Sequence, residues 1–259
     1  MKPKVLILHA TGTNRDHDAA QAVELAGGQP EIVHLNQLRC IERRWSDYQM
    51  LILPGGFSYA DALGAGRLLA LDLTIYFAEE VLSFVSSGKP VLGICNGFQA
   101  LVKSGILPDP DDLEASQKLT LTHNANGSFE CRWVTLLPAS QNCIWTAELQ
   151  ELIFCPAAHG EGRLIPQSSA VLDDLRNHDQ VALVYAKQDG SPAGDDYPDN
   201  PNGSVAGIAG ICNRRGNVLG LMPHPENHVL PWQFPYKSMH PYGSGLHLFK
   251  NGVSFASQC

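Results

Sequence analysis

Residues 90–99 read Pro-Val-Leu-Gly-Ile-Cys-Asn-Gly-Phe-Gln and predict a buried strand that turns sharply into a helix. Within this stretch, Gly93-Ile94-Cys95-Asn96-Gly97 has the order of a nucleophile elbow, with sulfur in place of the usual serine oxygen. The flanking glycines permit the turn, and the helix N-terminus at its tip favours a thiolate. We therefore expect Cys95 to be a nucleophile, although a cysteine that ends a buried strand is commonly an inert core residue.

The apolar runs on either side of this turn predict an α/β fold. We expect strands at 4–8, 31–35, 49–53 and 90–94, with helices at 16–26, capped by Asp16, and as a pair within 61–86. Further strands are expected within 119–138, 154–163, 181–185 and 205–221, and a loop at 188–203. The alternation is typical of βαβ units, so we predict a mostly parallel, doubly wound central sheet with flanking helices. Sites in such sheets lie beyond the carboxyl ends of the strands, where Cys95 stands.

A cysteine nucleophile needs a base, and the base needs a group that orients it. Leu221-Met222-Pro223-His224-Pro225-Glu226 offers both, because Pro225 disfavours helical geometry at His224 and predicts an extended segment. In an extended chain, side chains two residues apart face the same way, so the Glu226 carboxylate would align the His224 imidazole. The alternative is a proline-rich surface loop with incidental polar residues.

Acyl transfer also needs hydrogen-bond donors for the tetrahedral oxyanion. Residues 51–58, Leu-Ile-Leu-Pro-Gly-Gly-Phe-Ser, predict a strand that ends in a Gly-Gly loop able to present backbone N–H groups. We expect one donor at Gly56 or Phe57 and the other at the N–H of Asn96. Alone, Pro-Gly-Gly is only a turn signal.

Taken together and in this order, the three elements resemble class I, triad-type glutamine amidotransferases, whose sheet is flavodoxin-like. The resemblance implies that Cys95 is the nucleophile, His224 the base and acid, and Glu226 the orienting carboxylate. It also places Gly55 and Gln99 at substrate-binding positions.

Longer blocks resemble one subfamily, the glutaminase subunits of phosphoribosylformylglycinamidine synthases. The blocks are residues 55–61, 93–99, 122–124, 129–133, 158–163, 200–204 and 222–226. The resemblance implies hydrolysis of L-glutamine to glutamate and ammonia through a cysteine thioester, for de novo purine biosynthesis. Arg15 and Ser128 depart from the subfamily pattern, since many members have a cysteine and an arginine there.

The resemblance also implies a partner, an ATP-dependent synthase subunit that converts formylglycinamide ribonucleotide to formylglycinamidine ribonucleotide, with a small third subunit in some complexes. The chain lacks a Gly-x-x-x-x-Gly-Lys-Ser/Thr loop, so ATP and Mg²⁺ are expected on that partner and no cofactor in this chain. Free ammonia is mostly protonated near neutral pH, which favours direct delivery.

Composition agrees with one enzyme domain over residues 1–259, located in the cytoplasm. Apolar residues make up 44% of the chain, and the net charge of −8 argues against nucleic acid or an anionic membrane as partner. The seven cysteines form no Cys-x-x-Cys pair, so a zinc site or a disulfide framework is not expected. His224 and His228 are four apart, but Pro225 spoils the helix that would align them on a metal.

Three alternatives remain at this stage. The chain could feed ammonia to another synthase, such as one for imidazole glycerol phosphate or GMP. It could be a different cysteine hydrolase on a similar sheet. It could also be a catalytically silent binding subunit, because sequence alone does not bring the three groups together.

Overall fold

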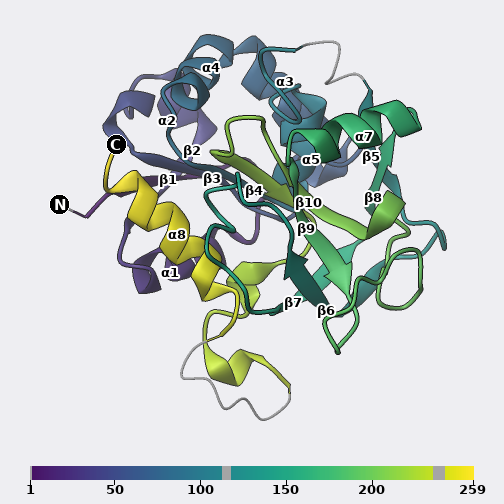
Figure 1. The fold of residues 1–259 in the computed structure, drawn as a ribbon. Coiled ribbons are helices and arrows are strands. Elements are labelled where there is room, and N and C mark those ends of the chain that lie inside the picture. The colour runs from purple at the N-terminus through teal and green to yellow at the C-terminus, as the bar shows by residue number, and fades with distance from the viewer. Residues whose placement is uncertain (1, 113–117, 236–242) are drawn as a thin grey trace.

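The computed structural model describes residues 2–112, 118–235 and 243–259 and centres on a nine-stranded sheet (Figure 1). Its strands are β1 (Lys4–His9), β2 (Gln29–His34), β3 (Met50–Leu53), β4 (Val91–Ile94), β6 (Glu130–Pro138), β7 (Ile153–His159), β9 (Val181–Ala186), β10 (Ile208–Cys212) and β11 (Val218–Leu221). Their spatial order is β2-β1-β3-β4-β11-β10-β9-β6-β7. Strands β5 (Leu119–His123) and β8 (Glu161–Pro166) form a separate antiparallel pair.

The region of the sheet around the elbow is parallel, as predicted. Strands β2, β1, β3, β4 and β11 pair in parallel. The inner residues of β1, β3, β4 and β11 are buried and mostly apolar, whereas β2 at the edge is partly exposed. Strands buried on both faces read as continuous apolar segments, which is why the sequence located them. The α/β class of the fold is confirmed.

Beyond β11 the sheet continues with antiparallel pairs through β10, β9, β6 and β7. The predicted strand region 205–221 divides into β10 and β11, which are joined by a tight turn. Gly216 closes that turn with φ of 75°, and a Cβ atom there would lie 2.1 Å from the carbonyl oxygen of Asn142. Only glycine fits this position, so the turn fixes where the chain reverses.

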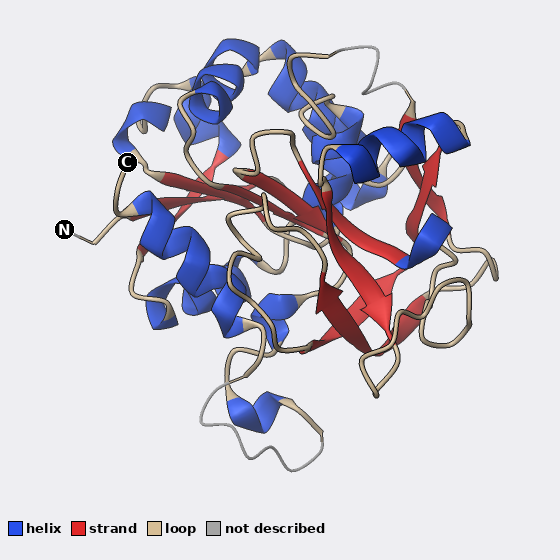
Figure 2. Ribbon diagram, in the orientation of Figure 1, coloured by secondary structure: helices blue, strands red, loops and turns tan. Residues whose placement is uncertain are grey.

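Helices cover both faces of the sheet (Figure 2). They are α1 (Asp16–Leu25), α2 (Leu35–Arg39), α3 (Arg67–Ile75), α4 (Ala78–Ser86), α5 (Asn96–Lys103), α7 (Ser169–Asn177) and α8 (Leu246–Ala256). Helices α1 and α8 pack on each other on one face, and α3 packs on α4 and α5 on the other. The paired helices expected within 61–86 are confirmed as α3 and α4. Within the described residues, no helix is long and apolar enough to cross a membrane.

The predicted cap of α1 is wrong. Arg15 occupies the N-cap position, and Asp16 lies inside the first turn. One oxygen of the buried Asp16 carboxylate accepts the N–H of His17 at 3.1 Å, and the other lies 2.7 Å from Nδ1 of His9, which ends β1. Asp16 therefore serves the first turn from inside the helix and also contacts β1, and it is not the N-cap residue.

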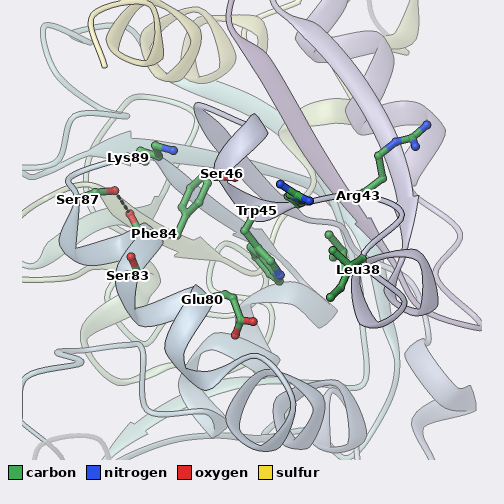
Figure 3. Close-up of a pocket in the computed structure, with 11 residues that line it drawn as sticks. Leu38, Arg43, Trp45, Ser46, Glu80, Ser83, Phe84, Ser87 and Lys89 are labelled. Atoms are coloured by element: carbon green, nitrogen blue, oxygen red, sulfur yellow. Dashed lines mark hydrogen bonds between the residues drawn. The ribbon is translucent and has the colours of Figure 1, made fainter.

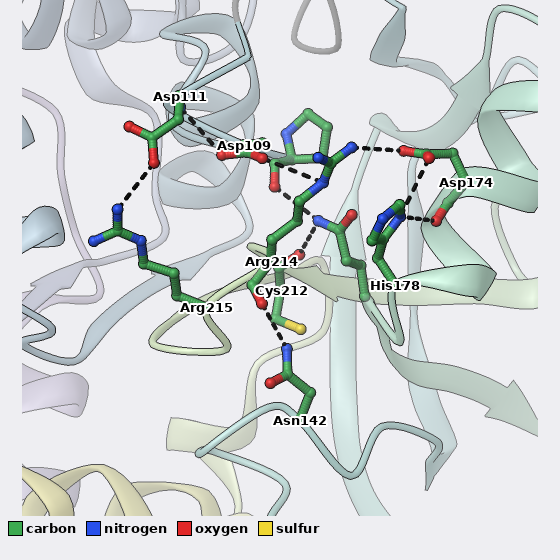
Figure 4. A network of polar contacts seen from close by, with 10 residues as sticks. Asp109, Asp111, Asn142, Asp174, His178, Cys212, Arg214 and Arg215 are labelled. Atoms are coloured by element: carbon green, nitrogen blue, oxygen red, sulfur yellow. Dashed lines mark hydrogen bonds and ion pairs between the residues drawn. The ribbon is translucent and has the colours of Figure 1, made fainter.

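A polar network ties the antiparallel part of the sheet to its surroundings (Figure 4). Arg214, in the turn between β10 and β11, pairs with Asp109 at 3.3 Å and with Asp174 of α7 at 3.2 Å. Arg215 pairs with Asp111 at 3.0 Å. These partly exposed pairs join the 109–111 segment to α7, and each is worth at most about 1 kcal/mol. Residues 113–117, which follow this segment, lie outside the described residues.

Helix α8, which the sequence patterns missed, yields a test of its packing. Gly252 lies in its interior, where alanine would gain about 1 kcal/mol of helix propensity. A Cβ atom there would lie 2.2 Å from the fully buried Trp145 ring, and overpacking of that kind costs about 1–3 kcal/mol or more. The clash outweighs the gain by up to about 2 kcal/mol, so Gly252→Ala should lower the Tm by up to about 8 °C in a thermal melt.

The control lies in the same helix. Ser254 is exposed, so Ser254→Ala gains propensity without a clash and should leave the Tm unchanged or slightly raised. A Gly252→Ala protein that melts at or above the wild-type temperature would contradict the packing seen here.

Candidate active site

The nucleophile stands on a strained turn between β4 and α5. Cys95 has φ of 49° and ψ of −102°, a conformation that non-glycine residues seldom adopt. A Cβ atom on Gly97 would lie 2.0 Å from the carbonyl oxygen of Leu53, and one on Gly93 would lie 2.9 Å from the backbone of Gly97. The glycines are needed because β3, β4 and α5 approach one another so closely. The elbow predicted from residues 93–97 is confirmed.

Strand pairing brings the base to the nucleophile. Leu221 at the end of β11 pairs with Ile94 at the end of β4, and its carbonyl accepts the N–H of Cys95 at 2.8 Å. The residues that follow both strands therefore meet at one edge of the sheet. The side chain of His224 interacts with that of Cys95, and its Nδ1 lies 2.7 Å from Oε1 of Glu226.

The local conformation of this pair differs from the prediction in one respect. His224 is non-helical, with φ of −109° and ψ of 83°, but Pro225–Asn227 forms a short 3-10 turn. The extended conformation expected around this pair is therefore wrong from Pro225 onward, and only His224 is non-helical. Proline is well suited to the first position of such a turn, which still folds Glu226 back against the imidazole.

The three groups form a buried, charged line. Glu226 is 1% exposed and His224 is 3% exposed. Burial alone would lower the pKa of His224, but the charges of Glu226 and Cys95 outweigh it and raise the pKa to about 10. The imidazole is thus protonated at neutral pH, and an imidazolium beside sulfur stabilises a thiolate.

Gly55 lies against both catalytic side chains. A Cβ atom at this position would lie 2.6 Å from Cε1 of His224 and 3.4 Å from Cβ of Cys95. The loop after β3 therefore passes directly over the sulfur–imidazole contact, where only a residue without a side chain fits.

The two predicted loop donors differ in availability. The N–H of Phe57 donates to the carbonyl of Gly12 at 3.1 Å, so it is already used within the protein. Gly56, with φ of 127°, and the first-turn N–H of Asn96 remain as the candidate donors. The oxyanion assignment accordingly narrows to Gly56 and Asn96.

Gln99 is a wall residue and not a solvent-facing helix position. Its side chain is 3% exposed, its Oε1 accepts from Asn96 at 3.2 Å, and its Nε2 donates to the carbonyl of Glu161. Any contact with substrate would therefore come from a side chain already fixed by two protein partners.

His159 is a site neighbour that sequence reasoning did not assign. It ends β7, directly after Ala158, whose carbonyl oxygen lies 3.9 Å from Sγ of Cys95. Burial, and then the charge of His224, lower the pKa of His159 to about 4, so its ring is neutral at pH 7. The only signal was the block at residues 158–163, which the resemblance marked without giving His159 a role.

The network around Asn124 fixes the tautomer of that ring. Nδ2 of Asn124 donates to the carbonyls of Ser128 and His159, so its Oδ1 faces the N–H of Gly162 and Nδ1 of His159. Nδ1 therefore carries the hydrogen, and Nε2 is left as an acceptor. That nitrogen is buried and has no hydrogen-bond partner among the described residues.

Two other features do not belong to the site. A cavity of about 460 Å³ at the amino ends of β3 and β4 lies at the opposite edge of the sheet (Figure 3). Its cations are partly engaged, since Arg43 pairs with Glu31 and Lys89 donates to the carbonyl of Tyr48. Across the described ranges, no group of three or more His, Cys, Asp or Glu side chains is placed to hold a metal.

A thiol on a strained strand–helix turn, next to an imidazole aligned by a buried carboxylate, defines a cysteine-dependent acyl-transfer enzyme. Comparison with protein families gives the particular kind. Residues 2–256 match the CobB/CobQ-like glutamine amidotransferase domain, and the chain belongs to this family.

Individual relatives agree with that assignment. Phosphoribosylformylglycinamidine synthase subunit PurQ of Treponema denticola is 59% identical over 242 residues, which cover 89% of this chain and 90% of that protein. The PurQ subunit of Dehalococcoides mccartyi is 42% identical over 261 residues, which cover 99% of each chain. A chain in the solved structure of PurLQS from Thermotoga maritima is 33% identical, with a TM-score of 0.75 and coverage of 98% of this chain and 99% of that one.

Gly55→Ala tests how tightly the site is packed. The added methyl group would displace the His224 ring, and a misplacement of about 1 Å costs about 100-fold in rate. We expect kcat/KM for glutamine hydrolysis to fall at least about 100-fold, with a lower Tm because the methyl group also overpacks a buried position. Gly160→Ala is the control, because its nearest contact would be Phe129 at 3.7 Å. Equal activity of the two variants would refute the close approach of Gly55.

The raised pKa of His224 predicts a pH dependence for labelling of Cys95. The imidazolium persists below about pH 10 and is lost as the pH rises through that value. Iodoacetamide should therefore alkylate wild-type Cys95 rapidly at pH 7. In Glu226→Gln, the main charge that raises this pKa is gone and burial makes His224 neutral. Labelling at pH 7 should then slow, because no imidazolium stabilises the thiolate.

Labelling must be mapped to the residue by mass spectrometry, since Cys40, Cys131 and Cys259 are exposed and also react. Their rates serve as internal controls in each sample. Identical pH profiles for Cys95 in wild type and Glu226→Gln would contradict the charged line.

Proposed function

We propose that this chain is the glutaminase subunit of a phosphoribosylformylglycinamidine synthase, acting as one amidotransferase domain over residues 1–259. The observation that carries the chemistry is the line from Cys95 through His224 to Glu226 at the end of β4. The observation that selects the acceptor is the 59% identity to a PurQ subunit over most of both chains.

The reaction follows from the charges at the site. The Cys95 thiolate attacks the carboxamide carbon of L-glutamine, and the carbonyl oxygen becomes an oxyanion. The backbone N–H groups of Gly56 and Asn96 donate hydrogen bonds to this oxyanion and stabilise its charge. His224 gives its proton to the leaving nitrogen, ammonia departs, and a thioester remains.

The second half restores the enzyme. His224 is now neutral and accepts a proton from a water molecule that attacks the thioester. The same N–H groups stabilise the second oxyanion. Glutamate then leaves, and the imidazolium–thiolate pair forms again. Glu226 holds the imidazole in one orientation through both halves.

Substrate contacts are assigned to the walls of the site. Gly55 permits the approach of the carboxamide to Cys95, and Gln99 lies four residues after Cys95 on the same helix. His159 offers a buried, neutral acceptor nitrogen that suits an N–H group of the substrate. We assign no metal and no cofactor to this chain.

Ammonia would pass to an ATP-dependent synthase subunit that holds ATP and Mg²⁺ and converts formylglycinamide ribonucleotide to formylglycinamidine ribonucleotide. Two relatives are named as subunits of such a synthase, and the structural relative comes from a complex called PurLQS. We place the complex in the cytoplasm, with a small third subunit as a further partner.

Cys95→Ala provides the central test. Without sulfur no thioester forms, so glutamine-dependent synthesis by the chain assembled with its synthase partner should fall at least about 1000-fold. Synthesis supplied with ammonium chloride should remain, because ammonia then reaches the partner directly. Initial rates with each nitrogen source decide the matter.

A second measurement separates an enzyme from a silent module. A glutamine-like chloroketone should label Cys95, and excess glutamine should protect it. Glutaminase activity that survives in Cys95→Ala, or labelling that glutamine does not slow, would overturn the proposal.

A further inference from the structure

The side chain of Asn96 links the two segments that carry the candidate oxyanion donors, which are the loop containing Gly56 and the start of α5. Its Oδ1 accepts from Oγ of Ser58 at 2.5 Å and from the N–H of Ser58 at 3.3 Å. Its Nδ2 donates to Oδ1 of Asp61 at 3.1 Å and to Oε1 of Gln99 at 3.2 Å. We propose that the Asn96 carboxamide is a positioning group that holds the loop containing Gly56 in register with the start of α5; this rests on the glutaminase function proposed above.

The amide has no capacity left for a substrate. A carboxamide offers two acceptor lone pairs and two N–H groups, and all four are used within the protein. Asn96 is 2% exposed and Ser58 is also 2% exposed. The side chain therefore acts through the backbone that it holds, while the backbone N–H of Asn96 remains free to face the oxyanion.

The loop needs such an anchor because its other side is held separately. Phe57 donates its N–H to Gly12, and Tyr59 donates its N–H to the carbonyl of Thr11 at 2.6 Å. These bonds fix the loop to the segment after β1, and none of them involves Cys95 or α5. The hydrogen bonds between Asn96 and Ser58 join the loop to the start of α5 and so help to set the position of Gly56 relative to Cys95.

The backbone after Ser58 is strained, so the loop needs the Asn96 hydrogen bonds to keep its conformation. Tyr59, Ala60 and Asp61 have φ values of 55°, 53° and 53°, so three successive non-glycine residues are left-handed. Such a turn persists only where its surroundings hold it. The hydroxyl of Tyr59 donates to Asp72, and the carboxylate of Asp61 accepts from Asn96. Loss of the Asn96 bonds would let the turn relax and carry the loop with it.

Ser58→Ala and Asn96→Ala test these hydrogen bonds in the full chain assembled with its synthase partner. We expect kcat for glutamine hydrolysis to fall about 10- to 100-fold, less than the 100- to 1000-fold seen when an oxyanion donor is deleted outright. KM should change less than about 3-fold. Alkylation of Cys95 by iodoacetamide should stay within about 2-fold of wild type, because displacement of iodide forms no oxyanion and needs only the thiolate.

Ser140→Ala is the matched control. The Ser140 hydroxyl is also buried, at 1% exposure, and donates to the carbonyl of Asp179 at 2.7 Å, away from the site. Its loss should lower the Tm as Ser58→Ala does, with no loss of kcat. If Asn96→Ala does not fold, Ser58→Ala still decides, since it removes a single oxygen.

A reversed pair tests the bond to Asp61 directly. Asn96→Asp keeps an acceptor for Ser58 but sets two carboxylates against each other, so kcat should fall. Adding Asp61→Asn restores a donor between the same positions and should recover at least about 10-fold of the lost kcat. A purely structural role would not give recovery in kcat alone at constant alkylation rate.

Three results would overturn the inference: kcat unchanged in Ser58→Ala, kcat and alkylation falling together, or no recovery in the reversed pair. A wild-type complex without glutaminase activity would instead refute the proposed function and is distinguished by that control.

Discussion

The site depends on one constraint, the left-handed backbone of Cys95 between a buried strand and a helix. With φ of 49°, this residue cannot continue β4 and cannot begin α5 in a regular way, so the chain must reverse within one residue. The reversal is possible because Gly97 lets the helix rest on the carbonyl of Leu53. The backbone strain at Cys95 is therefore offset by the packing of the buried helix α5 against β3 and β4.

The same packing controls the electrostatics. Burying an imidazole would normally leave it neutral, yet His224 is charged because Glu226 and Cys95 lie on either side of it. His159 follows Ala158, whose carbonyl lies near the sulfur, and it shows the opposite outcome. No carboxylate offsets its burial, and its pKa falls to about 4. Two buried histidines thus take different charge states, and only one of them can transfer a proton near neutral pH.

Much of this could be read from the sequence where the signal is local. Cys95, His224 and Glu226 lie in short motifs at strand ends, and the strand candidates near residues 4–8, 31–35, 49–53 and 90–94 each contain a short apolar run, so both were found. Asp16 was assigned wrongly because its partner, His9, lies on another element. Helix α8 was missed although its buried apolar residues Leu246, Phe249, Val253 and Ala256 recur at helical spacing, and the structure adds its contacts with α1 and Trp145. The single domain, the substrate contacts and the absence of a cofactor stay predictions.

The antiparallel half of the sheet also forms part of the candidate active site. Strand β7 belongs to that half, yet its Pro156 carbonyl accepts the N–H of His224 and its Ala158 carbonyl lies beside Cys95. The nucleophile is delivered by a parallel strand, and the base is held in place by an antiparallel one. A flavodoxin-like parallel sheet alone would supply the elbow without this wall, because Ala158, which lies beside the sulfur, and Glu161, which holds Gln99, come from the antiparallel part of the structure. The addition of β10, β9, β6 and β7 is therefore what turns an exposed thiol at a sheet edge into a buried site, and burial is what makes the charges of Glu226 and Cys95 strong enough to govern His224.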